Sequence, residues 1–264
     1  MENKANVVIV GAGIVGCSIA YHLTQLGCKD IVVVEQGPLY ETGGSTSHAP
    51  GLVFQINPSK TMAEFAKYTS KLWPELDLNG QPTAKAVGSL EIAWTEARLL
   101  DLKRRYGYAK SWEIEAHLIS SKEARDKIPM LSEKTLGALY VPGDIQTKAT
   151  RPAEAMALKS IENGAKFYEY TKVIGFDLTD GKITSVNTDK GKIQTDRVIV
   201  AAGIWGPRIG KLAGVHIPLS PVQHIYAVTS SLNGLTEEID EIRQPFIRHQ
   251  DEAMYFRQEG NGYG

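Results

Sequence analysis

The chain has 264 residues, of which 42% are apolar and 22% are charged, a composition typical of globular proteins with a sizeable core. Its formal net charge is -1 with acids and bases interspersed, which argues against nucleic acid as a partner. No apolar run approaches the ~18 residues of a membrane span, and the first residues lack the pattern of a signal peptide. The two cysteines suggest no disulfide framework, so we expect a cytoplasmic protein without a membrane partner.

The first residues predict a strand, a glycine-rich turn, a helix and a second strand. Residues 6–10 are a β-branched run typical of a buried parallel strand, and Gly11, Gly13 and Gly16 follow it as G-x-G-x-x-G. These glycines permit a tight turn, close approach of a pyrophosphate and packing of the helix on the strand. The second strand ends at Glu35, 19 residues after Gly16, close to the ~20 expected for the acid that binds an adenosine ribose. This order predicts dinucleotide binding but does not distinguish NAD from FAD.

A loop of small residues at 43–51, with the sequence GGSTSHAPG, follows this unit. Such a loop can bring its backbone close to a ligand and present one imidazole, that of His48. Taken alone, the loop favours a surface turn in which His48 is an ordinary polar residue. A long cofactor held at Glu35 could extend toward His48, which favours a flavin ring at this loop.

The rest of the chain alternates between helical and strand patterns. Apolar spacing predicts helices at 61–77 with a break near Pro74, at 96–106 closed by Gly107, at 121–127, and at 151–161. A strand is predicted at 87–93, a three-stranded meander from 167–170, 171–176 and 183–188, and further strands at 219–226, 247–251 and 254–257. We assign 1–80 and 148–215 to a discontinuous cofactor-binding domain, and 81–147 and 216–264 to a substrate-binding lobe.

A second diagnostic stretch at 196–205 reads D-x-V-(I/V)-x-A-A-G-x-W. A buried strand here ends in the small residues Ala202 and Gly203, where a bulky side chain would collide with a cofactor held over the strand end. Together with the first glycine motif, this stretch favours FAD over NAD.

The run GGSTSHAPGLVFQ at 43–55, continued by NPSKTM at 57–62, resembles the family of dimethylglycine oxidases, dimethylglycine dehydrogenases and sarcosine dehydrogenases. The stretch at 196–205 is similar to that of the wider D-amino-acid oxidase superfamily. The resemblance implies an α/β fold, α+β overall, with a glutathione-reductase-type Rossmann domain and β-meander interleaved with an α+β substrate lobe. It also implies oxidation of an N-methylated amino acid, dimethylglycine or sarcosine, by hydride transfer to an FAD bonded covalently to His48.

The resemblance further implies roles for individual residues. His224 and Tyr255 would face the substrate as catalytic residues, and Tyr255 would also contact the cofactor. Glycine motif and resemblance together give the cofactor-binding set Gly11, Gly13, Ile14, Val15, Gly16, Glu35, Gln36, Ser45, Thr46, Ser47, His48, Leu52, Val173, Ala202, Gly203 and Tyr255. Arg248 or Arg257 could pair with a substrate carboxylate, and the sequence does not choose between them. No cluster of potential ligands has metal-site spacing, so no metal is expected.

The chain stops in what reads as the middle of a sheet, so we expect an N-terminal fragment, incomplete at the C-terminus, of a longer enzyme. Tetrahydrofolate would then belong only to the missing C-terminal part. Two alternatives stay open: a truncated fragment without catalytic activity, and another amino-acid oxidase of the superfamily with non-covalent FAD. The sequence separates neither oxidase from dehydrogenase nor dimethylglycine from sarcosine, and it predicts no oligomeric state.

Overall fold

The computed structural model describes residues 1–41, 43–235 and 242–264. The chain forms two compact units, each built from two segments: the first from Met1–Ala49 and Lys148–Gln223, the second from Pro50–Thr147 and His224–Gly264. Residues 50–80, which the sequence led us to place in the cofactor-binding domain, lie in the second unit, because helix α3 (Lys60–Glu75) packs on strands of that unit. Residues 216–223 lie in the first unit, although we placed them in the substrate-binding lobe.

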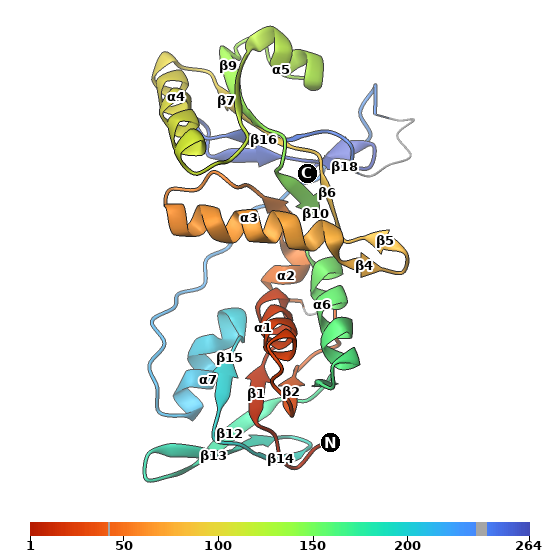
Figure 1. Ribbon diagram of the computed structural model, residues 1–264, viewed down its shortest axis with the longest axis vertical. Helices are drawn as coiled ribbons and strands as arrows, with labels where there is room; N and C mark the ends of the chain where they lie inside the picture. Colours follow the sequence, from red (N-terminus) through yellow and green to blue (C-terminus); the bar gives the residue numbers. More distant parts are fainter. Residues whose placement is uncertain (42, 236–241) are drawn as a thin grey trace. The chain divides into compact units, whose positions relative to one another are not determined.

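The first unit is built on a parallel four-stranded sheet flanked by helices (Figure 1). Its strand order is β11 (Lys166–Tyr168), β2 (Ile31–Val34), β1 (Val7–Val10) and β15 (Val198–Val200). The helical segments are α1 (Ile14–Gln25), α2 (Ser45–His48), α6 (Thr150–Glu162), the 3-10 helix η1 (Gly203–Trp205) and α7 (Gly206–Leu212). The predicted α/β fold is confirmed.

Buried aliphatic side chains explain this sheet. All four residues of β1 and all four of β2 are buried, as expected for central parallel strands covered on both faces. Helix α1 packs on α6 (Figure 1) and buries small residues such as Cys17 and Ala20. Cys17 and Cys28 are both free thiols.

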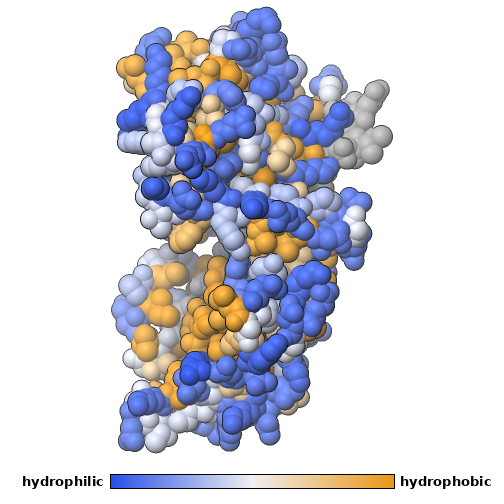
Figure 2. Space-filling model, viewed as in Figure 1, coloured by the Kyte–Doolittle hydropathy of each residue, from blue (hydrophilic) through white to orange (hydrophobic). Residues whose placement is uncertain are grey.

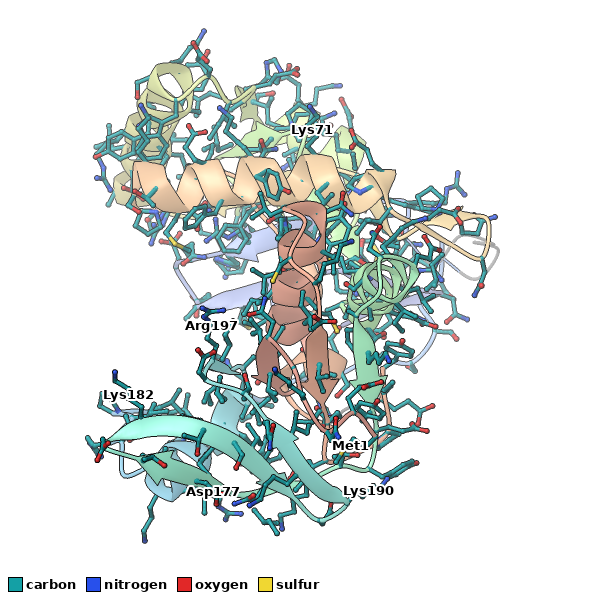
Figure 3. The ribbon with its side chains drawn as sticks, turned by 60° about the horizontal axis from the view of Figure 1, so that its bottom comes forward. Met1, Lys71, Asp177, Lys182, Lys190 and Arg197 are labelled. Carbon is teal, nitrogen blue, oxygen red and sulfur yellow. The ribbon has the colours of Figure 1, made fainter. Side chains whose placement is uncertain are left out.

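A separate antiparallel meander completes the first unit. It consists of β12 (Val173–Thr179), β13 (Lys182–Thr188) and β14 (Gly191–Gln194). The sequence placed residues 167–170 in the meander, but β11 instead pairs in parallel with β2, since its main-chain partners are Val32 to Val34. Figure 3 shows Asp177, Lys182 and Lys190 among the polar side chains of the meander. Hydrogen bonds from Lys192, Asn187 and Ser185 hold the pKa of the Asp177 carboxyl well below its usual range.

The second unit is built on a mixed five-stranded sheet with helices and smaller strand pairs. The sheet order is β17 (Met254–Phe256), β16 (Phe246–His249), β7 (Ser89–Ala93), β9 (Gly137–Val141) and β8 (His117–Ser120). Its remaining elements are α3, α4 (Glu96–Ser111), α5 (Ser121–Lys127), β3 (Leu52–Val53), β4 (Asp77–Leu78), β5 (Gln81–Pro82), β6 (Ala84–Ala86), β10 (Ile145–Thr147), β18 (Gln258–Glu259) and β19 (Gly262–Tyr263). No helix among the described residues is long and apolar enough to cross a membrane.

Two helices of the second unit differ from their predicted ends. The helix predicted at 61–77 is α3, which begins one residue earlier and contains Pro74 in its last turn. The helix predicted to close at Gly107 continues to Ser111 as α4, because Leu102 and Ala109 extend one buried face across the glycine. The predicted α5 is confirmed, with a reciprocal capping box between Ser120 and Glu123.

The strand predicted at 219–226 is wrong. These residues have no regular secondary structure, and Val222 and Ile225 are almost fully exposed, so their apolar pattern is not satisfied by a partner strand among the described residues. The strand pair predicted near 247–257 is present as β16 and β17, which pair antiparallel.

Candidate functional site

The turn between β1 and α1 leaves no room for side chains at two of its glycines. Gly11 has a φ of +106°, and a Cβ there would lie 2.5 Å from the carbonyl oxygen of Ala201, just after β15. A Cβ at Gly16 would lie 1.9 Å from the carbonyl oxygen of Gly11. Both glycines are therefore required by the packing of α1 against the strand ends. The first-turn amides of α1 have no intrahelical acceptors, which suits them to an anion.

Glu35 is positioned at the end of β2 as the glycine motif requires. It is only 8% exposed, and its two carboxylate oxygens accept hydrogen bonds from the backbone N–H groups of Ala12 (2.9 Å) and Gly37 (3.0 Å). Each oxygen keeps a further lone pair, so the carboxylate can still accept from ribose hydroxyls. The residues of this turn thus fit an adenosine dinucleotide.

The short helix α2 brings the 43–48 loop onto the start of α1. The hydroxyl of Thr46 accepts a hydrogen bond from the backbone N–H of Ile14 at 3.0 Å, which satisfies one of the free amides of α1. A Cβ at Gly44 would lie 3.3 Å from the ring of Trp205, so the loop passes close to this ring. The loop that carries His48 and the predicted phosphate-binding turn are therefore neighbours within the first unit.

The imidazole of His48 has one nitrogen engaged. Its Nδ1 lies 2.9 Å from the carbonyl oxygen of Gly44 and 3.1 Å from the hydroxyl of Ser47. A carbonyl oxygen can only accept, so this contact requires the tautomer with a proton on Nδ1. The lone pair is then on Nε2, which has no hydrogen-bond partner among the described residues, and the His48 side chain is exposed.

Apolar side chains are exposed around the same strand ends. Val15 in the first turn of α1 is 58% exposed, and Val200 at the end of β15 and Ile204 in η1 are also exposed. Figure 2 shows apolar surface on the first unit in the region of β15 and α7. Exposed apolar groups beside a glycine turn are typical of a ligand groove and suit the flat ring of a cofactor.

The remaining predicted cofactor residues are divided between the units. In the first unit, Gln36, Ser45, Ser47 and Gly203 are exposed, Ala202 is half-buried, and Val173 is buried at the start of β12. Leu52 lies in β3 of the second unit. Gly13 is the N-cap of α1 in an extended conformation.

The two predicted catalytic residues both lie in the second unit. Tyr255 is half-buried in β17, whereas His224 is exposed in the irregular segment after Ser220. No hydrogen bond or ring contact joins these two side chains in the part of the chain that the structure describes. Tyr226, which the sequence did not single out, lies near Tyr255. Burial, with a hydrogen bond to Glu259, raises the pKa of Tyr226 to about 12.

Tyr255 shares one sheet face with Arg248. The two residues are direct partners in the antiparallel pairing of β16 and β17, so their side chains lie on the same face. The Arg248 guanidinium lies over the Phe54 ring at 3.8 Å and donates to Glu91 at 3.1 Å. The structure gives it no second acceptor among the described residues, which leaves donors for an anion.

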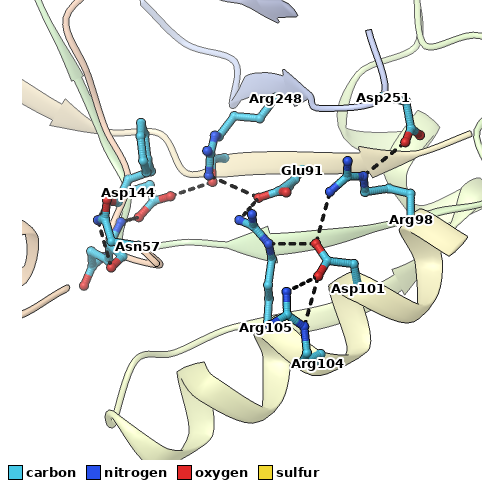
Figure 4. Close-up of polar contacts among 12 residues, drawn as sticks. Asn57, Glu91, Arg98, Asp101, Arg104, Arg105, Asp144, Arg248 and Asp251 are labelled. Atoms are coloured by element: carbon cyan, nitrogen blue, oxygen red, sulfur yellow. Dashed lines mark hydrogen bonds and ion pairs between the residues drawn. The ribbon is translucent and has the colours of Figure 1, made fainter. Parts of the chain in front are cut away.

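A network of charged side chains surrounds Glu91, the carboxylate that accepts from Arg248 (Figure 4). Arg105 of α4 donates to Glu91 at 3.0 Å and also to Asp101, which in turn receives Arg98 and Arg104. Asp144 accepts from the Ser89 hydroxyl and the Gln55 backbone N–H, and burial raises its pKa to about 7. The sequence did not indicate this network, because residues 141–144 show only the pattern of a turn.

Arg257 is occupied differently. Its guanidinium is buried and donates to the carbonyl oxygens of Pro50, Thr147 and Gln258. Of the two arginines that the sequence left open for a substrate carboxylate, the contacts therefore favour Arg248. Among the described residues, no group of three or more His, Cys, Asp or Glu side chains could hold a metal ion.

Comparisons with known proteins agree with this geometry. The profile of the FAD dependent oxidoreductase family matches residues 6–263. The chain is 31% identical to the mitochondrial sarcosine dehydrogenase of Mus musculus and 32% identical to the mitochondrial dimethylglycine dehydrogenase of Homo sapiens. These matches cover 99% of the chain and 28% and 30% of those proteins. The predicted resemblance to sarcosine and dimethylglycine dehydrogenases is confirmed.

Two further comparisons extend the range of relatives. The chain is 35% identical, over 86% of its length and 26% of the relative, to the mitochondrial pyruvate dehydrogenase phosphatase regulatory subunit of Mus musculus. The L-proline dehydrogenase structure from P. horikoshii shares the fold, with a TM-score of 0.85 at 24% identity, over 100% of this chain and 69% of that one. The chain spans less than a third of the length of these curated relatives. It belongs to the family of FAD dependent oxidoreductases.

Proposed function

We propose that the protein is a flavoenzyme that oxidises an N-methylated amino acid, dimethylglycine or sarcosine. The observation that carries the proposal is the contact of Thr46 with Ile14, which seats the loop of His48 on the dinucleotide-binding turn. Similarity to sarcosine and dimethylglycine dehydrogenases over 99% of the chain supports the substrate class. The same loop without a contact to the dinucleotide-binding turn would not indicate that His48 lies near a cofactor.

In this proposal the first unit holds the cofactor. The amides at the start of α1 that Thr46 leaves free bind the pyrophosphate, and the Glu35 carboxylate accepts from the ribose hydroxyls. His48 holds the ring end covalently, and Nε2 is the nitrogen available for the bond because Nδ1 donates to Gly44. When bound, FAD supplies the acceptor for the hydride that leaves the N-methyl carbon.

The second unit contributes the groups for the substrate. The substrate nitrogen must be neutral before it loses hydride, so a residue that holds or removes its proton is required. His224 and Tyr255 are our candidates for this role, and Arg248 beside Tyr255 is the candidate for the substrate carboxylate.

The tether is tested by acid denaturation of the purified protein. We expect the flavin to stay with the precipitated wild-type polypeptide, and His48→Ala to retain at most FAD that dissociates on denaturation. His117→Ala, which changes an exposed histidine in the second unit, is the control and should keep its flavin. Complete loss of flavin from the denatured wild-type protein would reject the covalent role of His48. It would favour the alternative of an amino-acid oxidase with dissociable FAD.

A second candidate is a regulatory protein without turnover, because the chain is 35% identical to a pyruvate dehydrogenase phosphatase regulatory subunit. Anaerobic mixing with dimethylglycine or sarcosine separates the two. Bleaching of the flavin absorbance supports the enzyme, and a flavin that stays oxidised with both amines supports the regulatory protein. The cytoplasmic location and a folate site in a further C-terminal part stay predictions.

A further inference from the structure

Arg257 is a buried cation without an acid beside it in the part of the chain described. It is 3% exposed, and no carboxylate lies within ion-pair distance of it among the described residues. Its guanidinium instead donates to the Pro50 carbonyl at 2.8 Å and the Thr147 carbonyl at 3.1 Å. Burying an unpaired charge is unfavourable. A role for Arg257 beyond filling space would explain why an arginine stands at this position.

The two carbonyls lie where the second unit begins and where its first segment ends. That segment runs from Pro50 to Thr147, so two of the three chain crossings between the units leave from these residues, the third being at Gln223–His224. These two crossings are also joined to each other, because the Thr147 N–H donates to the Gly51 carbonyl at 2.9 Å. Gly51 has a φ of +69°, and a Cβ there would lie 1.9 Å from the Thr147 carbonyl oxygen. We call Pro50, Gly51, Thr147 and Arg257 the clasp.

The clasp adjoins two predicted parts of the catalytic machinery along the chain. His48 lies two residues before Pro50, and Tyr255 lies two residues before Arg257. One guanidinium nitrogen, Nη1, donates to both carbonyls, and its two N–H directions are fixed by the guanidinium plane, whereas an ammonium group can rotate. Holding Pro50 limits where the backbone that carries His48 can go.

We propose that Arg257 is a positioning residue for the flavin loop: by fixing Pro50 and Thr147, it sets the anchor from which His48 reaches the cofactor. This inference rests on the proposed function, because it takes the flavin to lie at His48. It assigns Arg257 no contact with substrate, which distinguishes it from Arg248.

The test compares three variants of the protein. Arg257→Lys keeps the charge but loses the fixed directions of the Nη1 donors, and Gly51→Ala places a Cβ against the Thr147 carbonyl oxygen. Gly88→Ala is the matched control: Gly88 lies in the same unit with a φ of +79°, and its Cβ would lie 2.8 Å from the Tyr140 ring and 3.1 Å from the Val141 carbonyl oxygen rather than against Thr147. Amide hydrogen exchange at Thr147 reports the clasp, and the fraction of flavin that survives acid denaturation reports its effect on His48.

We expect Arg257→Lys and Gly51→Ala to speed exchange at Thr147. We also expect them to lower the rate of covalent flavin attachment by about tenfold or more, because small misplacements of reacting groups have effects of this size. Gly88→Ala should leave both readouts near wild type at the same folded fraction. If Arg257→Lys does not fold, Gly51→Ala decides the result.

Two results would overturn the inference. One is faster exchange at Thr147 with an unchanged rate of flavin attachment, which would make Arg257 a purely structural residue. The other result concerns a wild-type protein whose flavin dissociates on denaturation, an outcome that by itself rejects only the His48 tether of the proposed function. The clasp is then judged by the Kd for FAD, and a Kd in Arg257→Lys equal to that of Gly88→Ala rejects it.

Discussion

The carboxyl group of Asp144 is 1% exposed and is held by the Ser89 hydroxyl at 2.6 Å and the Gln55 backbone N–H at 2.8 Å. Burial raises its pKa from 3.8 to about 7, although these hydrogen bonds and the charge of Arg248 act in the opposite direction. The folded protein therefore binds this proton more tightly than the unfolded chain does. The stability that Asp144 contributes is fully present below pH 3.8 and is lost as the pH rises to about 7.

Replacing Asp144 by Asn should remove this component of the pH dependence. The amide keeps an acceptor for Gln55, and its NH2 can donate to the Ser89 oxygen. We expect the wild-type free energy of unfolding to fall by up to about 1.4 kcal/mol per pH unit from this group, and Asp144→Asn to lack that slope. Urea unfolding between pH 3.8 and about 7 measures it. Asp126→Asn, at an exposed pair with Lys122, is the control, and equal slopes in all three proteins would contradict the assignment.

The Arg248 guanidinium is partly paired with Glu91 and still has donors available for a ligand. One of its nitrogens binds Glu91, while the guanidinium face is covered by Phe54. Burial lowers the pKa of Arg248, and the nearby Glu91 raises it, so the arginine stays charged on the face shared with Tyr255. This arrangement suits a carboxylate ligand.

Replacing Arg248 by Lys should weaken substrate binding selectively. On the proposed function, we expect KM for dimethylglycine or sarcosine to rise roughly tenfold with kcat little changed, since a fork of donors becomes a single ammonium. Steady-state kinetics measure the change. Arg105→Lys alters the same Glu91 from the α4 side and is the control. An equal rise of KM in both variants would mean that the network, and not Arg248, is responsible.

At the scale of elements, a residue of the short helix α2 caps the first turn of helix α1. The Thr46 hydroxyl accepts from the Ile14 N–H, although the two residues are 32 positions apart, so one segment caps another. The sequence predicted Thr46 only as part of a cofactor lining. The capping contact explains how a loop of small residues acquires a defined position on the glycine turn.

Thr46→Val should loosen this junction. The change keeps the shape but leaves the Ile14 N–H without its acceptor, so we expect a loss of about 1 kcal/mol of stability in the protein without cofactor, together with weaker FAD binding. Thermal unfolding and FAD titration measure the two effects. Thr69→Val is the control, because the exposed Thr69 hydroxyl donates to the Phe65 carbonyl within α3. Unchanged FAD affinity in Thr46→Val would separate the loop from the cofactor site.

Element boundaries were predicted best where local signals dominate. The helix α5 follows its hydroxyl cap and ends before Pro129, so its residues alone contain the information. The end of α4 was predicted wrongly at Gly107, because buried Leu102 and Ala109 outweigh the low helix propensity of one glycine. Strand β11 was placed in the wrong sheet, since a short β-rich run does not reveal its partner.

At the scale of the whole molecule, the chain passes between two units and returns. Each unit draws on two distant segments, so both cores require contacts across long stretches of sequence. The sequence indicated this interleaving through its resemblance to a family. The sequence led us to group residues 50–80 with the first unit, because no local sequence signal marks Pro50 as the start of the second unit.

By itself, the sequence determined the α/β class, the glycine turn with Glu35, and membership of an FAD dependent family. These depend on short-range order, since strand, glycines, helix and acid follow one another within 35 residues. Only the tertiary structure decided that Thr46 caps α1, that Arg248 shares a face with Tyr255, and that Arg257 joins two of the three crossings between the units. Such contacts bring together residues as many as 207 positions apart, and their partners are selected by packing and burial rather than by neighbours in the chain.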